Sequence, residues 1–173
     1  MAASPYGSGA ATRAVFVGVE GLDWHCIEVA AAQWPEWEFH LIGPWQRPGL
    51  PANVVAHGVM PFARTLPFIR HADLGLHCVT VERPEFRTMT PKVLQYTACG
   101  LPIVASSGAA APLPHVIPYK LGSAASIRSA MQQAERFPRP DVPTEIARDW
   151  TLVAQDIAGA AGIHPTPTTD LPC

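Results

Sequence analysis

The sequence predicts an α/β fold, a Rossmann-like and mainly parallel sheet of about six strands with helices on both faces. The first observation is that short apolar runs recur along the chain, which is typical of buried strands. The second is that segments with helical apolar spacing and capping residues separate most of these runs. Strands that alternate with helices form parallel βαβ units, so the order of elements decides the class.

The apolar runs and the segments between them give the expected elements in chain order. Strands are expected over residues 14–18, 38–43, 53–58, 73–79, 101–105 and 115–119. Helices are expected over residues 23–33, 62–71, 90–99, 123–137 and 144–161. Asp23, Thr90 and Ser123 suit the capping position of three of these helices, because their side-chain oxygens accept from free backbone N–H groups. In the second helix the apolar stripe is expected to be Phe62, Leu66 and Ile69.

The stretch from Thr90 to Ser106 is the strongest local signal in the chain. Pro91 suits the first helical position and Gly100 suits the residue after the helix. The spacing places one set of side chains together on the helix, namely Lys92, Gln95, Tyr96 and Cys99. The other sides, expected to pack on the sheet, carry Val93, Leu94 and Ala98. A helix N-terminus with a lysine in its first turn predicts a phosphate site.

Composition limits the number of domains and the class of partner. The chain has 173 residues, of which 48% are hydrophobic and 15% charged, with a net charge of −2. This predicts one globular domain over residues 13–162, between a flexible leader at 1–12 and a disordered tail at 163–173. The charge gives no electrostatic case for nucleic acid.

Targeting and cysteine signals favour the cytoplasm. The N-terminus lacks the basic and apolar regions of a signal peptide, and no apolar run is long enough to span a bilayer. The four cysteines form no C-x-x-C pair, which favours free thiols in a reducing compartment. A peripheral membrane contact through an exposed apolar helix is left open.

Other catalytic and cofactor motifs are weak or missing. Gly18-x-x-Gly21 follows the first expected strand but is not G-x-G-x-x-G, so no dinucleotide cofactor is indicated. The histidines show no metal-ligand spacing, and His40, His57 and His77 fall on different strands, so no metal is expected. No D-x-D or G-x-S-x-G motif occurs.

The central stretch also resembles a known family. Lys92-Val93-Leu94-Gln95-Tyr96, followed by Gly100-Leu101-Pro102 and an apolar strand, is similar to the donor-site segment of GT-B glycosyltransferases. Within that family, the GumK-like glucuronosyltransferases are the most similar. Further matching pieces occur in the same order, at residues 4–6, 14–18, 38–43, 53–58, 65–72 and 150.

The resemblance implies a function and a set of binding residues. It implies the C-terminal, nucleotide-sugar-binding half of an inverting GT-B enzyme of polysaccharide or glycolipid assembly. The donor would be a UDP-sugar, with UDP-glucuronate as one candidate, and no further cofactor is implied. The implied binding residues are Gly18, Val19, Glu20, Arg83, Arg87, Thr90, Pro91, Lys92, Val93 and Gln95. Lys92 would neutralise a phosphate, Gln95 would bind the ribose or the sugar, and an arginine would suit a uronate carboxylate.

The resemblance assigns no catalytic residue to this chain. In that family the base lies in the other, acceptor-binding domain, so a separate acceptor-domain protein or self-association is expected. Two features of this sequence differ from those of the relatives. The 80–90 loop is basic, and Pro91 stands where a relative has a methionine. One alternative is a non-catalytic nucleotide-sugar-binding module or degenerate remnant. A weaker alternative is a generic phosphoribosyl or nucleotide binder.

Overall fold

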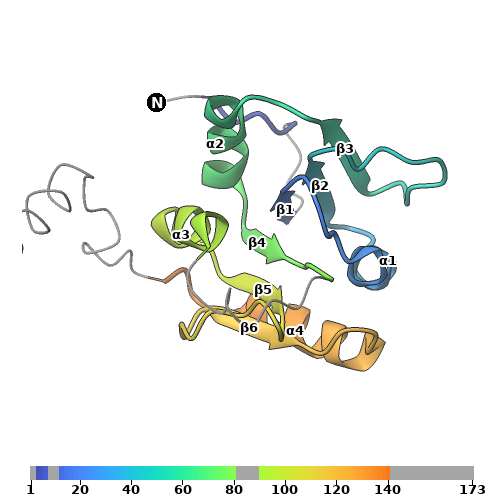
Figure 1. The fold of residues 1–173 in the computed structure, drawn as a ribbon, viewed down its shortest axis with the longest axis vertical. Coiled ribbons are helices and arrows are strands. Elements are labelled where there is room, and N and C mark those ends of the chain that lie inside the picture. Colours follow the sequence, from blue (N-terminus) through green and yellow to red (C-terminus); the bar gives the residue numbers. More distant parts are fainter. Residues whose placement is uncertain (1–2, 8–11, 81–89, 141–173) are drawn as a thin grey trace, which may run out of the picture. The chain divides into compact units, whose positions relative to one another are not determined.

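A single parallel sheet forms the centre of the molecule (Figure 1). The computed structural model describes residues 3–7, 12–80 and 90–140. The strands are β1 Arg13–Val17, β2 Glu38–Ile42, β3 Val54–Gly58, β4 Leu74–His77, β5 Ile103–Ser106 and β6 Val116–Tyr119. Their order is β3-β2-β1-β4-β5-β6, and every pair is parallel. The predicted six-stranded Rossmann-like sheet is confirmed.

Helices cover both faces of this sheet, as predicted (Figure 1). They are α1 Trp24–Gln33, α2 Phe62–His71, α3 Pro91–Ala98 and α4 Ala124–Arg136. Helices α1 and α4 share one apolar core with one face of the sheet, through residues such as Ile27 and Met131. Helices α2 and α3 share a second core with the other face, through Ile69, Val93 and Tyr96.

Side-chain caps fix where three of the helices begin. Asp23, Thr90 and Ser123 each accept a hydrogen bond from the backbone N–H three residues on, at 3.3–3.4 Å. Each bond satisfies one of the N–H groups that a helix start leaves free. After α3, Gly100 has a φ of +65°, a conformation that favours glycine and turns the chain directly into β5. All three predicted caps are confirmed.

The prediction for the faces of α3 was wrong in part. Tyr96, expected beside Lys92, is fully buried, and the buried face consists of Val93, Tyr96 and Thr97. Ala98, expected on the sheet side, is exposed. The reason is that Gly75 in β4 leaves room for the Tyr96 ring, which packs directly over that glycine. The spacing along α3 could not reveal this space in a strand distant in sequence.

The predicted apolar stripe of α2, Phe62, Leu66 and Ile69, was wrong in part, because only Ile69 is buried. Phe62 is 59% exposed and Leu66 is 41% exposed, whereas Thr65 and Ile69 are buried. The Thr65 hydroxyl donates to the Phe62 carbonyl at 2.7 Å, which allows this polar side chain to be buried. Helix α2 therefore leaves large apolar side chains exposed on its outer face.

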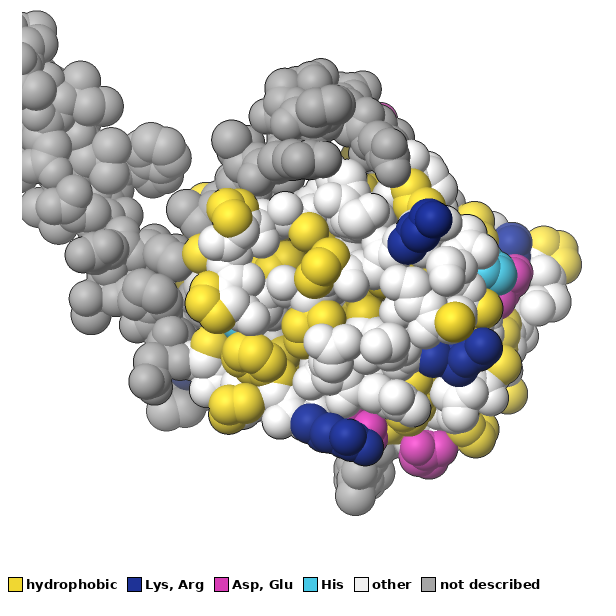
Figure 2. Space-filling view, turned by 90° about the horizontal axis from the view of Figure 1, so that it is seen from below, with side chains coloured by type: hydrophobic (Ala, Val, Ile, Leu, Met, Phe, Trp, Pro, Cys, Tyr) yellow, Lys and Arg dark blue, Asp and Glu magenta, His cyan; other side chains and the backbone are white. Residues whose placement is uncertain are grey.

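Strand β6 is one edge of the sheet, and Pro118 lies within it. A proline has no N–H to offer another strand, so it protects an edge from further pairing. Figure 2 views the molecule from the side of β6 and α4 and shows hydrophobic side chains gathered there, with Lys and Arg at the border. Exposed residues of β6 and the segment before it include Pro112, Pro114 and Pro118.

Three expectations concern segments outside the described residues, wholly or in part. The helix expected over 144–161 and the tail at 163–173 lie there, as does the basic loop at 81–89. Of the expected leader at 1–12, residues 3–7 and 12 are described. Among them Tyr6 is buried, and its hydroxyl donates to the Phe68 carbonyl of α2 at 2.6 Å.

Candidate functional site

The candidate site lies where the order of strands reverses. The chain runs from β1 outward to β2 and β3, then returns to place β4 on the other side of β1. The segments that leave β1 and β4 therefore diverge at the carboxyl edge of the sheet. In open α/β sheets this divergence makes the crevice in which ligands bind. Gly18 follows β1 at this point, and His77 is the last residue of β4.

Backbone hydrogen bonds join the two diverging segments. Leu22 and Val79 form an isolated antiparallel bridge. The Asp23 N–H donates to the Cys78 carbonyl at 3.0 Å, and the Thr80 N–H donates to the Gly21 carbonyl at 2.7 Å. The loop after β1 is thus held against the start of the loop that precedes α3.

The Lys92 side chain lies over Gly18 at the candidate site. Its Nζ lies 5.0 Å from the centre of the Phe16 ring. A Cβ added to Gly18 would lie 2.5 Å from the same Nζ, so the ammonium stands directly over this glycine. The first turn of α3 and the end of β1 are therefore in contact, and only glycine at position 18 leaves the lysine this place.

The charge of Lys92 is poorly compensated. Burial lowers the pKa of Lys92, while the Glu20 carboxylate acts in the opposite direction. Among the described residues, Lys92 forms neither a hydrogen bond nor a salt bridge. A partly desolvated cation without a bound partner favours an anion. The N-terminus of α3, capped by Thr90, adds its partial positive charge at the same place.

His77 is a polar residue of the site that the sequence did not single out for it. Its side chain is 5% exposed, and its Nδ1 has no hydrogen-bond partner in the described part of the chain. Burial, and to a smaller extent the positive charge of Lys92, lower the pKa of His77 to about 4. Ser106, the last residue of β5, is 1% exposed and its Oγ is likewise without a partner there.

Two aromatic side chains position the elements of the site. The Val17 N–H donates to the Tyr96 hydroxyl at 3.0 Å, which ties α3 to the end of β1. The Trp45 Nε1–H donates to the Gly18 carbonyl at 2.8 Å. Trp45 follows β2, so β1, β2 and α3 all contribute to the surroundings of Gly18. The sequence contains both aromatics, but no spacing pattern relates them to residues so distant along the chain.

The other sequence-predicted site residues differ in how far their side chains are exposed. Val19 is 69% exposed and Glu20 is also exposed, so both are open to a ligand at this edge. Gln95 is half-buried one turn after Lys92. The Val93 side chain is fully buried in the core, and its N–H is bonded to the Thr90 hydroxyl. Pro91 is exposed, and Arg83 and Arg87 lie outside the described residues.

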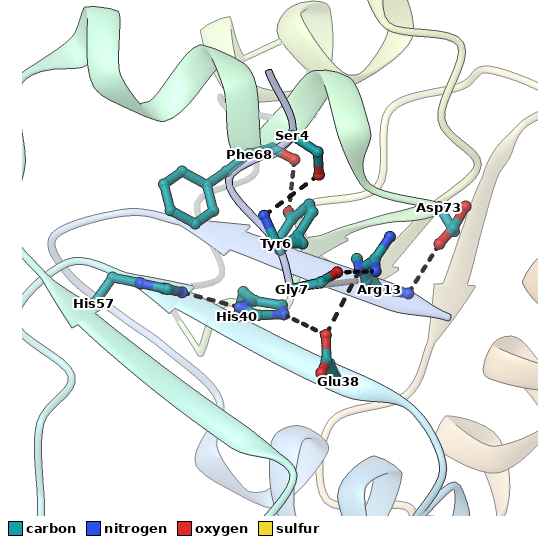
Figure 3. A network of polar contacts seen from close by, with 9 residues as sticks. All are labelled: Ser4, Tyr6, Gly7, Arg13, Glu38, His40, His57, Phe68 and Asp73. Atoms are coloured by element: carbon teal, nitrogen blue, oxygen red, sulfur yellow. Dashed lines mark hydrogen bonds and ion pairs between the residues drawn. The ribbon is translucent and has the colours of Figure 1, made fainter. Parts of the chain in front are cut away.

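A second polar cluster lies under α2, away from this edge (Figure 3). His40 Nδ1 is 2.9 Å from His57 Nε2, and His40 Nε2 is 3.3 Å from Glu38 Oε2. Burial lowers the pKa of both histidines. The Tyr6 ring packs against His40, with ring centres 4.5 Å apart. Hydrogen bonds already engage both nitrogens of His40, so this cluster fastens the N-terminal segment to the sheet.

Within the described residues, no group of three or more His, Cys, Asp or Glu side chains is arranged to hold a metal ion. None of the helices in this part of the chain has the length and apolar character needed to cross a bilayer.

Comparison with known sequences identifies relatives of this chain. A family model described as "Glycosyl transferase-like" matches residues 24–149. UDP-glucuronate:glycolipid 2-beta-glucuronosyltransferase of Xanthomonas campestris pv. campestris is 34% identical over 140 residues. That match covers 79% of this chain and 34% of the relative, so the chain spans about a third of the relative's length.

Comparison with solved structures agrees with the fold. A structure described as trehalose-6-phosphate from E. coli bound with UDP-2-fluoro glucose has a TM-score of 0.53 at 14% identity. That match covers 84% of this chain and 41% of the other. The OtsA apo structure has the same TM-score and identity, with 90% and 44% covered. At this identity the likeness bears on the fold alone.

Proposed function

Because the chain belongs to the glycosyl transferase-like family and has a GT-B type Rossmann-like fold, we propose that it is the nucleotide-sugar-binding half of a GT-B glycosyltransferase. The observation that carries this proposal is the position of Lys92 over Gly18. It places a poorly compensated cation and a helix N-terminus at the strand-order reversal, where a diphosphate gains most from both.

In this proposal the site residues act on the donor, and Lys92 is the principal one. Its ammonium neutralises the diphosphate, both in the bound donor and as the leaving group departs with its developing charge. The loop at Gly18, Val19 and Glu20 approaches the diphosphate with its backbone. Gln95, one turn further along α3, hydrogen-bonds the ribose or the sugar.

We propose a UDP-sugar as donor, with UDP-glucuronate as the first candidate. The support comes from the 34%-identical relative, whose name gives UDP-glucuronate as donor and a glycolipid as acceptor. Arg83 and Arg87 are the candidates for the uronate carboxylate, because a guanidinium binds a carboxylate through two parallel hydrogen bonds. A GumK-like, inverting transfer in polysaccharide or glycolipid assembly is the corresponding reaction.

The acceptor is proposed to bind on a second domain that faces the same edge. Three exposed apolar residues, Val19, Val59 and Phe62, follow β1, follow β3 and begin α2, so all lie at the carboxyl edge of the sheet. Exposed apolar side chains beside a site favour contact with another protein surface. This supports an acceptor-domain protein or a second copy of the chain as partner.

The general base is proposed to come from that second domain. Asp23, the buried carboxylate nearest the loop after β1, accepts from the Tyr119 hydroxyl at 2.7 Å and from the Cys26 N–H. It is therefore engaged in holding α1 and β6. We expect the 173-residue chain alone to bind the donor without turnover. Steady transfer from UDP-glucuronate to a lipid-linked acceptor by the pure chain would contradict this expectation.

Nucleotide binding tests the proposal directly. In a thermal-shift panel of UDP, GDP, ADP and their sugars, UDP compounds should stabilise the chain, by about 2.7 kcal/mol at 100 times Kd. Lys92→Ala should weaken UDP binding by about 1.5–3 kcal/mol, and Gln95→Ala by about 0.5–1.5 kcal/mol. Arg128→Ala, which removes an exposed cation from α4, is the matched control and should leave UDP binding unchanged. Unchanged affinity in both site variants would place the nucleotide elsewhere.

The second candidate is a non-catalytic nucleotide-sugar-binding module or degenerate remnant. The engagement of Asp23 in structural hydrogen bonds is the observation that favours it. The two candidates differ when an acceptor-domain partner is added, because only the enzyme half should then transfer sugar. A chain that binds no nucleotide at all would favour the remnant.

A further inference from the structure

His77, the last residue of β4, has a buried ring nitrogen without a hydrogen-bond partner among the described residues. Its side chain points to the face of the sheet that α3 covers, since it shares that face with Gly75, over which the Tyr96 ring packs. Only 5% of the residue is exposed, and its Nδ1 has no hydrogen-bond partner among the described residues. A buried polar atom without a partner is costly, so each one in a folded domain calls for an explanation.

None of the described neighbours of His77 forms a hydrogen bond with this nitrogen. Across the sheet, His77 is paired with Ala105, which has no polar side chain. The Tyr96 hydroxyl of α3 accepts the Val17 N–H. The Lys92 ammonium is a donor only, and its positive charge opposes protonation of the ring.

His77 is therefore a neutral imidazole at neutral pH. Burial and the charge of Lys92 together hold its pKa at about 4. A neutral ring carries one N–H donor and one acceptor nitrogen. Beside a lysine and a helix N-terminus, the local field is positive, so the group best placed to meet the ring is an anion that accepts its N–H.

We propose that His77 is a diphosphate-binding residue, whose Nδ1–H donates to a phosphate oxygen of the nucleoside diphosphate that Lys92 and the start of α3 hold. This assignment rests on the proposed function and adds a residue to that site. It explains why a polar side chain is retained at a buried strand end without a protein partner. Without ligand, the Nδ1–H group of His77 is oriented but has no acceptor, and a bound diphosphate supplies one.

A sugar hydroxyl is the competing ligand group for the same nitrogen. The position of His77 favours the phosphate, because the charge of Lys92 acts on the His77 ring and the Lys92 ammonium lies over Gly18 at the end of β1. The two groups are separable by experiment, since UDP carries the diphosphate without the transferred sugar, and uridine carries neither.

The test compares His77→Leu with His77→Asn, using the full chain and calorimetry with UDP and uridine. Leucine removes both ring nitrogens at similar size, whereas asparagine keeps a polar group near the position of Nδ1. For His77→Leu we expect UDP affinity to fall about ten- to a hundredfold, with uridine affinity unchanged. His77→Asn should retain most of the UDP affinity. The thermal midpoint of His77→Leu should equal or exceed that of the wild type, because an unpartnered buried polar group has been removed.

These outcomes distinguish a binding role from a structural one. A purely structural histidine would lower the thermal midpoint in the leucine variant and leave UDP affinity unchanged, and that result would overturn the assignment. A loss seen with UDP-sugars but not with UDP would overturn the phosphate assignment in favour of a sugar hydroxyl. If the wild type binds no UDP, the proposed function and this inference both fail. If the wild type binds UDP and His77→Leu binds it with the same affinity, the assignment of His77 fails while the proposed function stands.

Discussion

The contact between Gly75 and Tyr96 is the most stringent structural feature beneath the candidate site. Gly75 lies in the middle of β4, between Val15 of β1 and Ile103 of β5. A Cβ at Gly75 would lie 2.7 Å from Tyr96 Cδ2 and 2.8 Å from Cγ. The ring cannot easily move away, because it is fully buried and its hydroxyl accepts the Val17 N–H. Gly75→Ala should therefore shift α3 as a whole.

The expected magnitude follows from two opposing effects. Overpacking a core by one methyl group costs about 1–3 kcal/mol. Gly75 does not have a positive φ, so alanine fits the backbone and stabilises through the unfolded chain by about 0.4–1 kcal/mol. Gly75→Ala should lower the free energy of unfolding by about 1–2 kcal/mol, the net of these two effects. Because α3 carries Lys92, UDP affinity should fall as well.

Urea unfolding of a double-mutant cycle measures this contact. In a Tyr96→Ala background the ring is gone, so Gly75→Ala should become neutral or slightly stabilising. Tyr96→Phe is the matched control, since it removes the hydroxyl but keeps the ring, and Gly75→Ala should remain destabilising there. If Gly75→Ala is equally costly in the wild-type and Tyr96→Ala backgrounds, the ring contact is not the cause and the reasoning is refuted.

Three further predictions follow from single groups. The pKa of His77 is about 4 in the fold against 6.5 when unfolded, so the stability that this residue contributes above pH 6.5 is lost as pH falls toward 4, by about 3 kcal/mol. Urea unfolding at pH 7 and pH 4.5 should show this loss, and His77→Leu should abolish the contribution of His77 to it. Asp23→Ala removes a helix cap and leaves the Tyr119 hydroxyl unpaired, which should cost about 2–4 kcal/mol in urea unfolding, and Asp23→Asn much less. Gly18→Ala should displace the flexible end of Lys92, so calorimetry should show weaker UDP binding with a nearly unchanged thermal midpoint.

The order and type of the elements could be predicted because their signals are local. A cap such as Asp23 or Thr90 acts on N–H groups two or three residues away, and Gly100 acts on its own φ. The apolar runs mark strands that are buried on both faces, as parallel strands are. The resemblance to GT-B enzymes brought Gly18 and Lys92 into one hypothesis, and the two residues meet at the carboxyl edge of the parallel sheet.

The details that were wrong or missed depend on partners distant along the chain. The burial of Tyr96 follows from the missing side chain of Gly75. The pairing of His40 with His57 joins adjacent strands. None of these relations is a spacing within one element, so periodicity along the sequence could not show them.

Satisfaction of hydrogen bonds separates the two polar clusters of the molecule. Under α2, both ring nitrogens of His40 have partners and Tyr6 donates to a carbonyl, so this cluster is complete without a ligand. At the carboxyl edge, His77 and Ser106 end adjacent strands with buried polar atoms that lack partners among the described residues, and the charge of Lys92 acts on His77. Burial without a partner is unfavourable in the absence of a ligand. For His77 and Ser106 this cost lies at the edge where the fold itself opens a crevice, which is the physical argument for placing the donor there.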